Sequence, residues 1–391
     1  MNILVLGAGL MGRGAVYDLS HNSPDVSGIT VADADVRMAE ITAKIYGVET
    51  CTPRHLEASD YDATVELMRG HDAAISCVPY VYNLQLAQAA VKARVNFCDL
   101  GGNNDIVRQE LALDEQARAA GINIIPDCGL APGMVSLLAM YGAEKFEALD
   151  SIHIRVGGLP QKPKPPLDYQ LVFSVEGLIN EYVEPARVIR NGRIETIESM
   201  TEIEPLEVDG FGRLEAFQTS GGISTLPETF FGKLRELDYK TIRYPGHCVQ
   251  FKTLIDLGFA SSQPVLVTSA DQAETVEIKP RNFLRDALLR HLPRNEPDAV
   301  IIRLEFRGRL DDAEQMLRFD IIDRFDPITD LSAMMRTTAF PASIVAQMMG
   351  RGEALRKGAI PQEIALNSDR FVTELARRNI VINEQLFPIK D

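Results

Sequence analysis

The chain has 391 residues, of which 46% are hydrophobic, so it is long enough to build two domains around sizeable cores. Its 55 acidic residues against 40 basic ones give a net charge of −15, which argues against nucleic acid or an anionic membrane as a partner. No apolar run approaches the ~18 residues that a membrane span needs, and the N-terminus shows no signal-peptide pattern. The five scattered cysteines lack CxxC spacing. Together these features predict a cytoplasmic protein with reduced thiols.

A glycine-rich turn follows the first apolar run, in the stretch "NILVLGAGLMGRGAVYDL". Residues 2–6 predict a buried strand, and a helical pattern continues to about Leu19. The glycines Gly7, Gly9 and Gly12 between them match the GxGxxG motif of a dinucleotide site. In that motif the glycines allow a tight turn, close approach of a pyrophosphate, and close packing of helix on strand. The free N–H groups at the helix start would bind the phosphates.

The second expected strand, "GITVADAD", ends at Asp33, 21 residues after Gly12. An acid at this place accepts hydrogen bonds from the ribose hydroxyls and repels a 2′-phosphate, which favours NAD over NADP. Asp33 could instead be an ordinary turn residue. Arg37 is near enough to weaken the discrimination between the two cofactors.

Strands and helices continue to alternate up to residue 127. Helices are expected over 61–70, 83–93 and 106–121, and strands over 72–78, 95–100 and 122–127. This alternation predicts an α/β Rossmann domain over residues 1–127, with a parallel sheet covered on both faces. Ligands bind at the carboxyl ends of such strands, so we expect residues 77–83, 99–103 and 126–133 to share one rim.

The pattern changes after residue 128. Long alternating strands are expected over 299–310 and 315–325, and hairpins at Asn191-Gly192 and over 206–219. This indicates an α+β domain over residues 128–330, built on a largely antiparallel sheet. The tail, residues 331–391, has a helical pattern.

A polar cluster surrounds Pro245-Gly246 in this second domain. Arg243 could bind a carboxylate and His247 could move protons, or the segment could be a turn with a capping histidine. The six histidines are dispersed, so no metal site is expected. Hydride transfer from an amine or alcohol needs a nearby base. The candidates are Asp127, His247, Lys252, Tyr80 and Glu176.

The strings "GAGLMGRG", "VPY", "DLGGN", "PDCGLAPGM", "GGLPQ", "VFSVEGLINEY" and "RYPGH" occur in an order that resembles the saccharopine dehydrogenase superfamily. Within it, the chain is most similar to the L-lysine 6-dehydrogenase branch. The resemblance implies a Rossmann domain, a second domain with a central mixed sheet, and C-terminal helices over 331–391 that return to the first domain. It also implies a homodimer.

The reaction implied by the resemblance is the NAD-dependent oxidative deamination of the lysine ε-amine. Its products are ammonia and 2-aminoadipate 6-semialdehyde, which cyclises to 1-piperideine-6-carboxylate. The implied cofactor contacts are Gly7, Gly9, Leu10, Met11, Gly12, Asp33, Val78 and Pro79. On the substrate side, we expect Asp127, His247 and Tyr80 as catalytic residues, and Arg243, Tyr244 and Glu176 as binding residues for an amino acid.

One departure from the family pattern narrows this expectation. Saccharopine reductases carry an acid in a Gly-Leu-Asp-Pro-Gly motif, and Ala131 stands in its place here. The change favours the lysine branch and leaves Asp127 as the charged group of that segment, either as an ammonium ligand or base, or as a structural cap. Glu176 could likewise simply start a helix. Two alternatives stay open: a reductase like saccharopine reductase or carboxynorspermidine synthase, and a non-catalytic NAD-binding protein.

Overall fold

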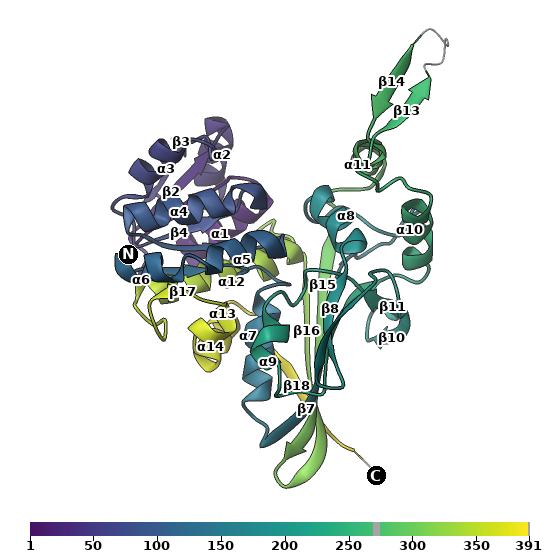
Figure 1. The fold of residues 1–391 in the computed structure, drawn as a ribbon. Helices are drawn as coiled ribbons and strands as arrows, with labels where there is room; N and C mark the ends of the chain where they lie inside the picture. The colour runs from purple at the N-terminus through teal and green to yellow at the C-terminus, as the bar shows by residue number, and fades with distance from the viewer. Residues whose placement is uncertain (269–273, 390–391) are drawn as a thin grey trace.

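The computed structural model describes residues 1–268 and 274–389. It contains two large sheets with helices packed around and between them (Figure 1). The first sheet is all parallel, and the second combines parallel and antiparallel pairs. The expected combination of a Rossmann domain with a mixed-sheet α+β domain is therefore confirmed.

The first sheet has seven parallel strands in the order β17-β6-β5-β4-β1-β2-β3. The strands are β1 (Asn2–Leu6), β2 (Gly28–Asp33), β3 (Cys51–His55), β4 (Ala73–Ser76), β5 (Asn96–Asp99), β6 (Asn123–Ile125) and β17 (Gly358–Ala359). β1 lies inside the sheet, between β4 and β2, and is apolar on both faces, because helices cover both sides of the sheet. Its carboxyl end therefore opens within the rim, away from both edges of the sheet.

Helices on this sheet are α1 (Leu10–His21), α2 (Val36–Tyr46), α3 (Tyr61–Met68), α4 (Asn83–Ala93), α5 (Asn104–Leu111) and α6 (Asp114–Ala120), with a short 3-10 turn η1 (Tyr80–Tyr82). The single helix expected over 106–121 is wrong, since α5 and α6 are separate. At the start of α6, the Asp114 carboxylate accepts a hydrogen bond from the Ala359 N–H at 3.0 Å. This contact fixes the second helix against β17.

The second sheet follows the order β10-β11-β12-β7-β15-β16-β18, with β8 and β9 attached through β12. The strands are β7 (Ala148–Pro160), β8 (Ala186–Arg190), β9 (Arg193–Ile197), β10 (Glu204–Val208), β11 (Gly212–Gln218), β12 (Glu236–Arg243), β15 (Asp298–Leu310), β16 (Ala313–Arg324) and β18 (Asn383–Pro388). Both expected hairpins form, and Asn191 and Gly192 have φ of 48° and 74°, as a tight hairpin turn requires. The helices of this part are α7 (Met134–Ala143), α8 (Val175–Val183), α9 (Leu226–Phe230), α10 (His247–Asp256) and α11 (Pro280–His291).

The C-terminal segment contacts both sheets. α12 (Ala333–Gly350) is almost wholly buried, and packs on α1, β4 and β5 on one side and on β15 and β16 on the other. α13 (Gln362–Ala365) and α14 (Ser368–Arg377) follow. Just after α14, Arg378 forms an ion pair of 2.7 Å with Asp18 of α1, and both side chains are enclosed. The tail is not purely helical as expected, because β17 extends the first sheet and β18 extends the second.

A two-stranded hairpin of β13 (Val265–Thr268) and β14 (Thr275–Ile278), here called the arm, projects beyond α11 (Figure 1). Every residue of both strands is exposed. Within residues 1–268 and 274–389, no helix is long and apolar enough to cross a lipid bilayer.

Candidate active site

The glycine loop between β1 and α1 has the shape that a dinucleotide needs. Gly7 has a φ of +97°, and a Cβ there would lie 2.9 Å from the Cys77 carbonyl oxygen. A Cβ on Gly12 would collide with the Gly7 carbonyl, so the helix can pack this closely only on glycine. A Cβ on Gly9 would meet nothing within 4 Å, so the backbone there is open to a ligand. The loop therefore fits a pyrophosphate at the start of α1.

A cavity of about 180 Å³ lies beside this loop at the ends of β1, β2 and β4. Four of the expected cofactor residues line it: Gly7, Asp33, Val78 and Pro79. The Asp33 carboxylate accepts hydrogen bonds from the backbone N–H of Ala8 at 2.7 Å and of Asp35 at 2.9 Å. These contacts hold it at the cavity wall, where a ribose would lie.

Besides these four and the loop glycines Gly9 and Gly12, the expected cofactor residues are Leu10 and Met11, which start α1. Leu10 is 39% exposed, while Met11 packs against the core. Near them Arg37 forms a two-pronged ion pair with Asp35, with N···O distances of 3.0 and 2.9 Å. The cation closest in sequence to Asp33 is thus already paired with an acid.

Buried acids occupy the rim beyond the cavity. Asp99 at the end of β5 and Glu110 of α5 have no solvent-exposed surface. Burial raises the pKa of Asp99 to about 6, against the backbone N–H groups of Gly101 and Asp127, which favour its charged form. Burial and the negative charges of Asp99 and Asp127 raise the pKa of Glu110 to about 11. Glu110 is therefore neutral at pH 7, next to an acid that can ionise.

Asp127 lies just after β6 and next to Asp99. It has a φ of 61°, and its carbonyl oxygen accepts a hydrogen bond from Gln362 at 2.7 Å. Both carboxyl oxygens are buried, and neither has a hydrogen-bond partner among the described residues. Burial, with the charges of Asp99 and Glu363, raises the pKa of Asp127 well above its usual range, although Ser224 nearby opposes the shift. An acid in this state can hold or accept a proton from a ligand amine.

The second domain contains a buried cation. Arg243, at the end of β12, is 3% exposed. Its Nε donates to the Tyr182 hydroxyl at 2.9 Å, its Nη1 donates to the Ile242 carbonyl at 2.9 Å, and its guanidinium lies 4.8 Å from the centre of the Tyr169 ring. All three partners are neutral, and none of the acids in the described part of the chain forms an ion pair with Arg243. A buried cation without a counter-ion is costly, so a ligand carboxylate would be well accommodated here.

His247 does not have the environment expected for an acid–base group. It is 1% exposed, with Nδ1 3.0 Å from the Leu167 carbonyl and Nε2 3.0 Å from the Tyr182 hydroxyl. Burial and the charge of Arg243 lower the pKa of His247 to about 3, so the ring stays neutral. Its Nδ1–H then donates to Leu167, and Nε2 accepts from Tyr182. The ring contacts the tyrosine that bonds to Arg243, and this enclosed, neutral environment does not favour the predicted acid–base role.

Three other residues singled out in the sequence are engaged elsewhere. Glu176 pairs with Arg281 at 2.8 Å, and 42% of its side chain is exposed. The Tyr244 hydroxyl donates to the Pro160 carbonyl at 2.9 Å, and as the neighbour of Arg243 in an extended segment it points to the other face of the sheet. Lys252 is paired with two surface carboxylates at 2.8 and 3.2 Å. All three side chains therefore already have partners within the protein.

Tyr80 lies where the two domains meet. Its hydroxyl accepts a hydrogen bond from the Asn180 amide of α8 at 3.3 Å, so it joins the Rossmann rim to the second domain. The next residue on α8, Glu181, was not among the expected site residues. Burial raises the pKa of Glu181 to about 7, while the nearby charge of Arg243 opposes the shift. Only the folded chain shows which of the two glutamates in "VFSVEGLINEY" approaches Arg243.

The fold and the loop geometry define a dinucleotide-binding oxidoreductase, and comparison with known proteins identifies its family. The saccharopine dehydrogenase NADP binding domain matches residues 3–125, and the saccharopine dehydrogenase C-terminal domain matches residues 129–381. The chain belongs to the saccharopine dehydrogenase family of NAD(P)-dependent oxidoreductases.

Individual relatives match the chain at low identity, over shares that range from 39% to nearly all of it. Saccharopine dehydrogenase [NADP(+), L-glutamate-forming] of Saccharomyces cerevisiae is 21% identical over 96% of this chain and 96% of its own length. Carboxynorspermidine synthase of Vibrio cholerae is 26% identical over 39% of this chain and 42% of its own. The apo structure of the yeast enzyme matches with a TM-score of 0.78 over 99% of both chains, at 21% identity. A homospermidine synthase from Legionella pneumophila in complex with NAD matches with a TM-score of 0.70 at 13% identity, over 99% of this chain and 91% of its own. These structural matches show the shared fold.

Proposed function

We propose that the protein catalyses the NAD-dependent oxidation of the ε-amine of L-lysine to an imine, which water then hydrolyses to 2-aminoadipate 6-semialdehyde and ammonia. The observation that carries the proposal is a pair of unmatched buried groups: the cation of Arg243 and the carboxyl of Asp127. A substrate with a carboxylate at one end and an amine at the other would satisfy both. Lysine has this form.

The protein's own residues would divide the work as follows. Arg243 binds the α-carboxylate, and Tyr182 and His247 fix its orientation. Asp127 holds the ε-amine and takes its proton, a task suited to a carboxyl whose pKa is raised by burial. When bound, the nicotinamide supplies the acceptor for a hydride. Tyr80 and Asn180 close the boundary between the domains and help to exclude water.

We further propose NAD as the preferred cofactor. The support is Asp33, whose carboxylate is fixed at the cavity wall and would repel a 2′-phosphate. The names of the matched domain family and of the yeast relative point to NADP instead. Arg37 is the residue through which NADP could be accommodated, if it left Asp35.

Saccharopine oxidation is the second candidate, because the yeast relative matches nearly the full chain. Saccharopine has three carboxylates and would need several cations. Arg243 is a buried cation without an acidic partner among the described residues, and Ala131 replaces the acid of the reductase motif. These two features favour lysine.

The test is the absorbance at 340 nm with NAD or NADP and L-lysine, L-ornithine, saccharopine, carboxynorspermidine or putrescine. Reduced cofactor formed with lysine alone is the expected result. Turnover of saccharopine or carboxynorspermidine without lysine would refute the proposal in favour of the reductase branch. Cofactor binding without any turnover would support the non-catalytic alternative.

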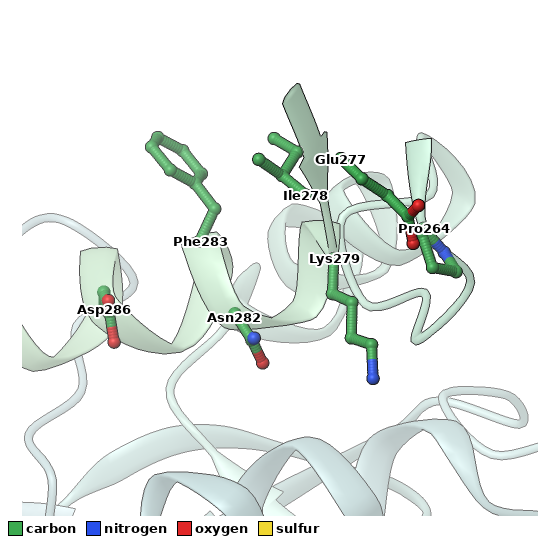
Figure 2. Close-up of a pocket in the computed structure, with 7 residues that line it drawn as sticks. All are labelled: Pro264, Glu277, Ile278, Lys279, Asn282, Phe283 and Asp286. Carbon is green, nitrogen blue, oxygen red and sulfur yellow. The ribbon is translucent and has the colours of Figure 1, made fainter. Parts of the chain in front are cut away.

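We also propose that two copies associate through the arm and its base. A two-stranded hairpin is marginally stable alone, and this one exposes Val265, Leu266 and Val276. Figure 2 shows the groove of about 460 Å³ at its base, with Ile278 and the 63% exposed Phe283 on its wall. Apolar surface of this kind is typical of an interface. Light scattering should give a dimer for the native chain and a monomer for Phe283→Asp; a native monomer would refute the proposal.

A further inference from the structure

Glu181 lies on α8 between two residues that contact different parts of the site. Its neighbours in the chain face two different parts of the site: Asn180 bonds to Tyr80 on the Rossmann side, and Tyr182 bonds to Arg243 in the second domain. Successive side chains on a helix are about 100° apart, so Glu181 points between these two directions. Its carboxylate therefore projects from the same stretch of helix as both contacts, near enough to Arg243 for the two charges to interact.

The Glu181 side chain is half-buried, and it has no hydrogen bond or ion pair within the described residues. By contrast, the other acid inside α8, Glu176, is fully occupied by Arg281. The backbone of Glu181 is nevertheless fixed, since its carbonyl accepts a hydrogen bond from the Ser220 N–H at 3.0 Å. The segment that begins at Ser220 continues to Ser224, which lies beside Asp127. Glu181 is thus an acid with a fixed backbone and no side-chain partner among the described residues. Its backbone bonds to the segment that leads to Asp127, and the next residue, Tyr182, bonds to Arg243.

The surroundings of this acid are mostly neutral and include one cation. Burial raises the pKa of Tyr169 and of Tyr239, and the negative charge of Glu181 adds to both shifts. Burial alone would lower the pKa of Arg243, but Tyr182, Tyr169 and Glu181 raise it. Glu181 is therefore close enough to sense Arg243 without forming an ion pair with it. A carboxylate bound to Arg243 would be repelled by Glu181 unless a positive group lay between the two acids.

We propose that Glu181 binds the α-ammonium group of the substrate whose α-carboxylate is bound by Arg243. The two side chains then recognise the zwitterionic head of an α-amino acid, and the far amine is left for Asp127. The proposal rests on the proposed function only in requiring an α-amino-acid substrate, a condition that both L-lysine and saccharopine meet.

The test compares L-lysine with 6-aminohexanoate, which keeps the carboxylate and the ε-amine but lacks the α-ammonium. In Glu181→Gln, kcat/KM for lysine should fall by about 10- to 100-fold, the usual effect of losing a charged hydrogen bond. The value for 6-aminohexanoate should not fall and should rise by up to a few-fold, because that probe never made the contact and its carboxylate is no longer repelled by Glu181. Glu184→Gln is the matched control: it removes a carboxyl just beyond the end of α8 that does not face Arg243, and should leave both substrates unchanged.

Two outcomes would overturn the proposal. An equal loss with both substrates would place Glu181 at the reacting amine or in the fold, and no loss with either would exclude a substrate contact. Cofactor binding, followed by the fluorescence of the reduced nicotinamide, and the melting temperature should match the native protein in both variants. A failure of these controls is resolved by Glu181→Ser, which removes the carboxyl with less polar bulk and should show the same selectivity.

The result is separable from the proposed function. If saccharopine is turned over and lysine is not, the function proposal fails, and Glu181 is tested with saccharopine against its analogue lacking the primary α-amine. If nothing is turned over, calorimetry measures the binding of lysine and of 6-aminohexanoate to the cofactor-loaded native protein and to Glu181→Gln. Equal affinities of the native protein for the two ligands would then refute the proposal.

Discussion

Replacing the buried acid Glu110 with glutamine should stabilise the protein at neutral pH. In the unfolded chain Glu110 ionises around its ordinary pKa of 4.5, whereas burial and the charges of Asp99 and Asp127 raise the folded pKa to about 11. Between these values folding takes up one proton, and the stability of the native protein falls by roughly 1.4 kcal/mol per pH unit. The contribution of protonated Glu110 to stability is fully present below pH 4.5 and is lost as the pH rises toward 11.

Glutamine is neutral at every pH, so Glu110→Gln removes this loss. At pH 7 the protonation that folding requires costs about 3 kcal/mol, from an unfolded pKa of 4.5. The difference in free energy of unfolding between variant and native protein should therefore widen by a few kcal/mol, on the order of 3, between about pH 5.5 and about pH 7.5. Asp99 and Asp127 are present in both proteins, so the difference reports Glu110 together with its coupling to Asp99.

Because the chain has no tryptophan, urea unfolding would be followed by far-ultraviolet circular dichroism at several pH values. Glu115→Gln, at an exposed acid on α6, is the control and should run parallel to the native protein at all pH values. Parallel curves for Glu110→Gln as well would show that Glu110 is ionised in the folded state. The account of the buried acids at the rim would then be wrong.

Three further substitutions test separate parts of the structure. Asp33→Asn should raise KM for NAD about 10-fold and narrow the preference over NADP, and an unchanged preference would remove Asp33 from the ribose site. His247→Gln should raise KM for the amino acid but leave the inflections of the pH profile in place, since the folded pKa is about 3; a lost inflection near neutrality would restore the acid–base role. Arg378→Met should lower stability by about 3–5 kcal/mol in urea unfolding, and the additional change Asp18→Leu should recover most of it; no recovery would mean that the ion pair is not the cause.

Local sequence patterns predicted local structure well. The glycine motif between strand and helix, the alternation up to residue 127, and the turn at Asn191-Gly192 each depend on neighbouring residues, and each is found in the structure. The pairing of β17 with β6 and of β18 with β16 was not predicted. These strands are short or exposed, and their partners lie far away in the chain, so no periodicity marks them.

The candidate site divides in the same way. Five of the eight predicted cofactor residues lie within one motif, so the sequence brings Gly7, Gly9 and Gly12 together directly. On the substrate side, residue type alone made His247 a candidate, yet enclosure by Tyr182 and Leu167 keeps its ring neutral. The acidity of Glu181 depends on Arg243, which is 62 positions later in the chain. Burial and contacts between distant residues determine the protonation of His247 and Glu181, and a local sequence pattern predicts neither.

The return of the C-terminal segment has a consequence for synthesis on the ribosome. The side chain of Asn123, the first residue of β6, donates a hydrogen bond to the carbonyl of Arg356, 233 positions later in the chain. The first sheet also lacks its α12 cover until that region emerges. At roughly 5–20 residues per second, this delay is on the order of 10–50 s. During that time the nascent nucleotide domain exposes the apolar face that α12 later covers. The chain therefore completes its first domain last, and its early translation product is a natural client for chaperones that bind apolar surface.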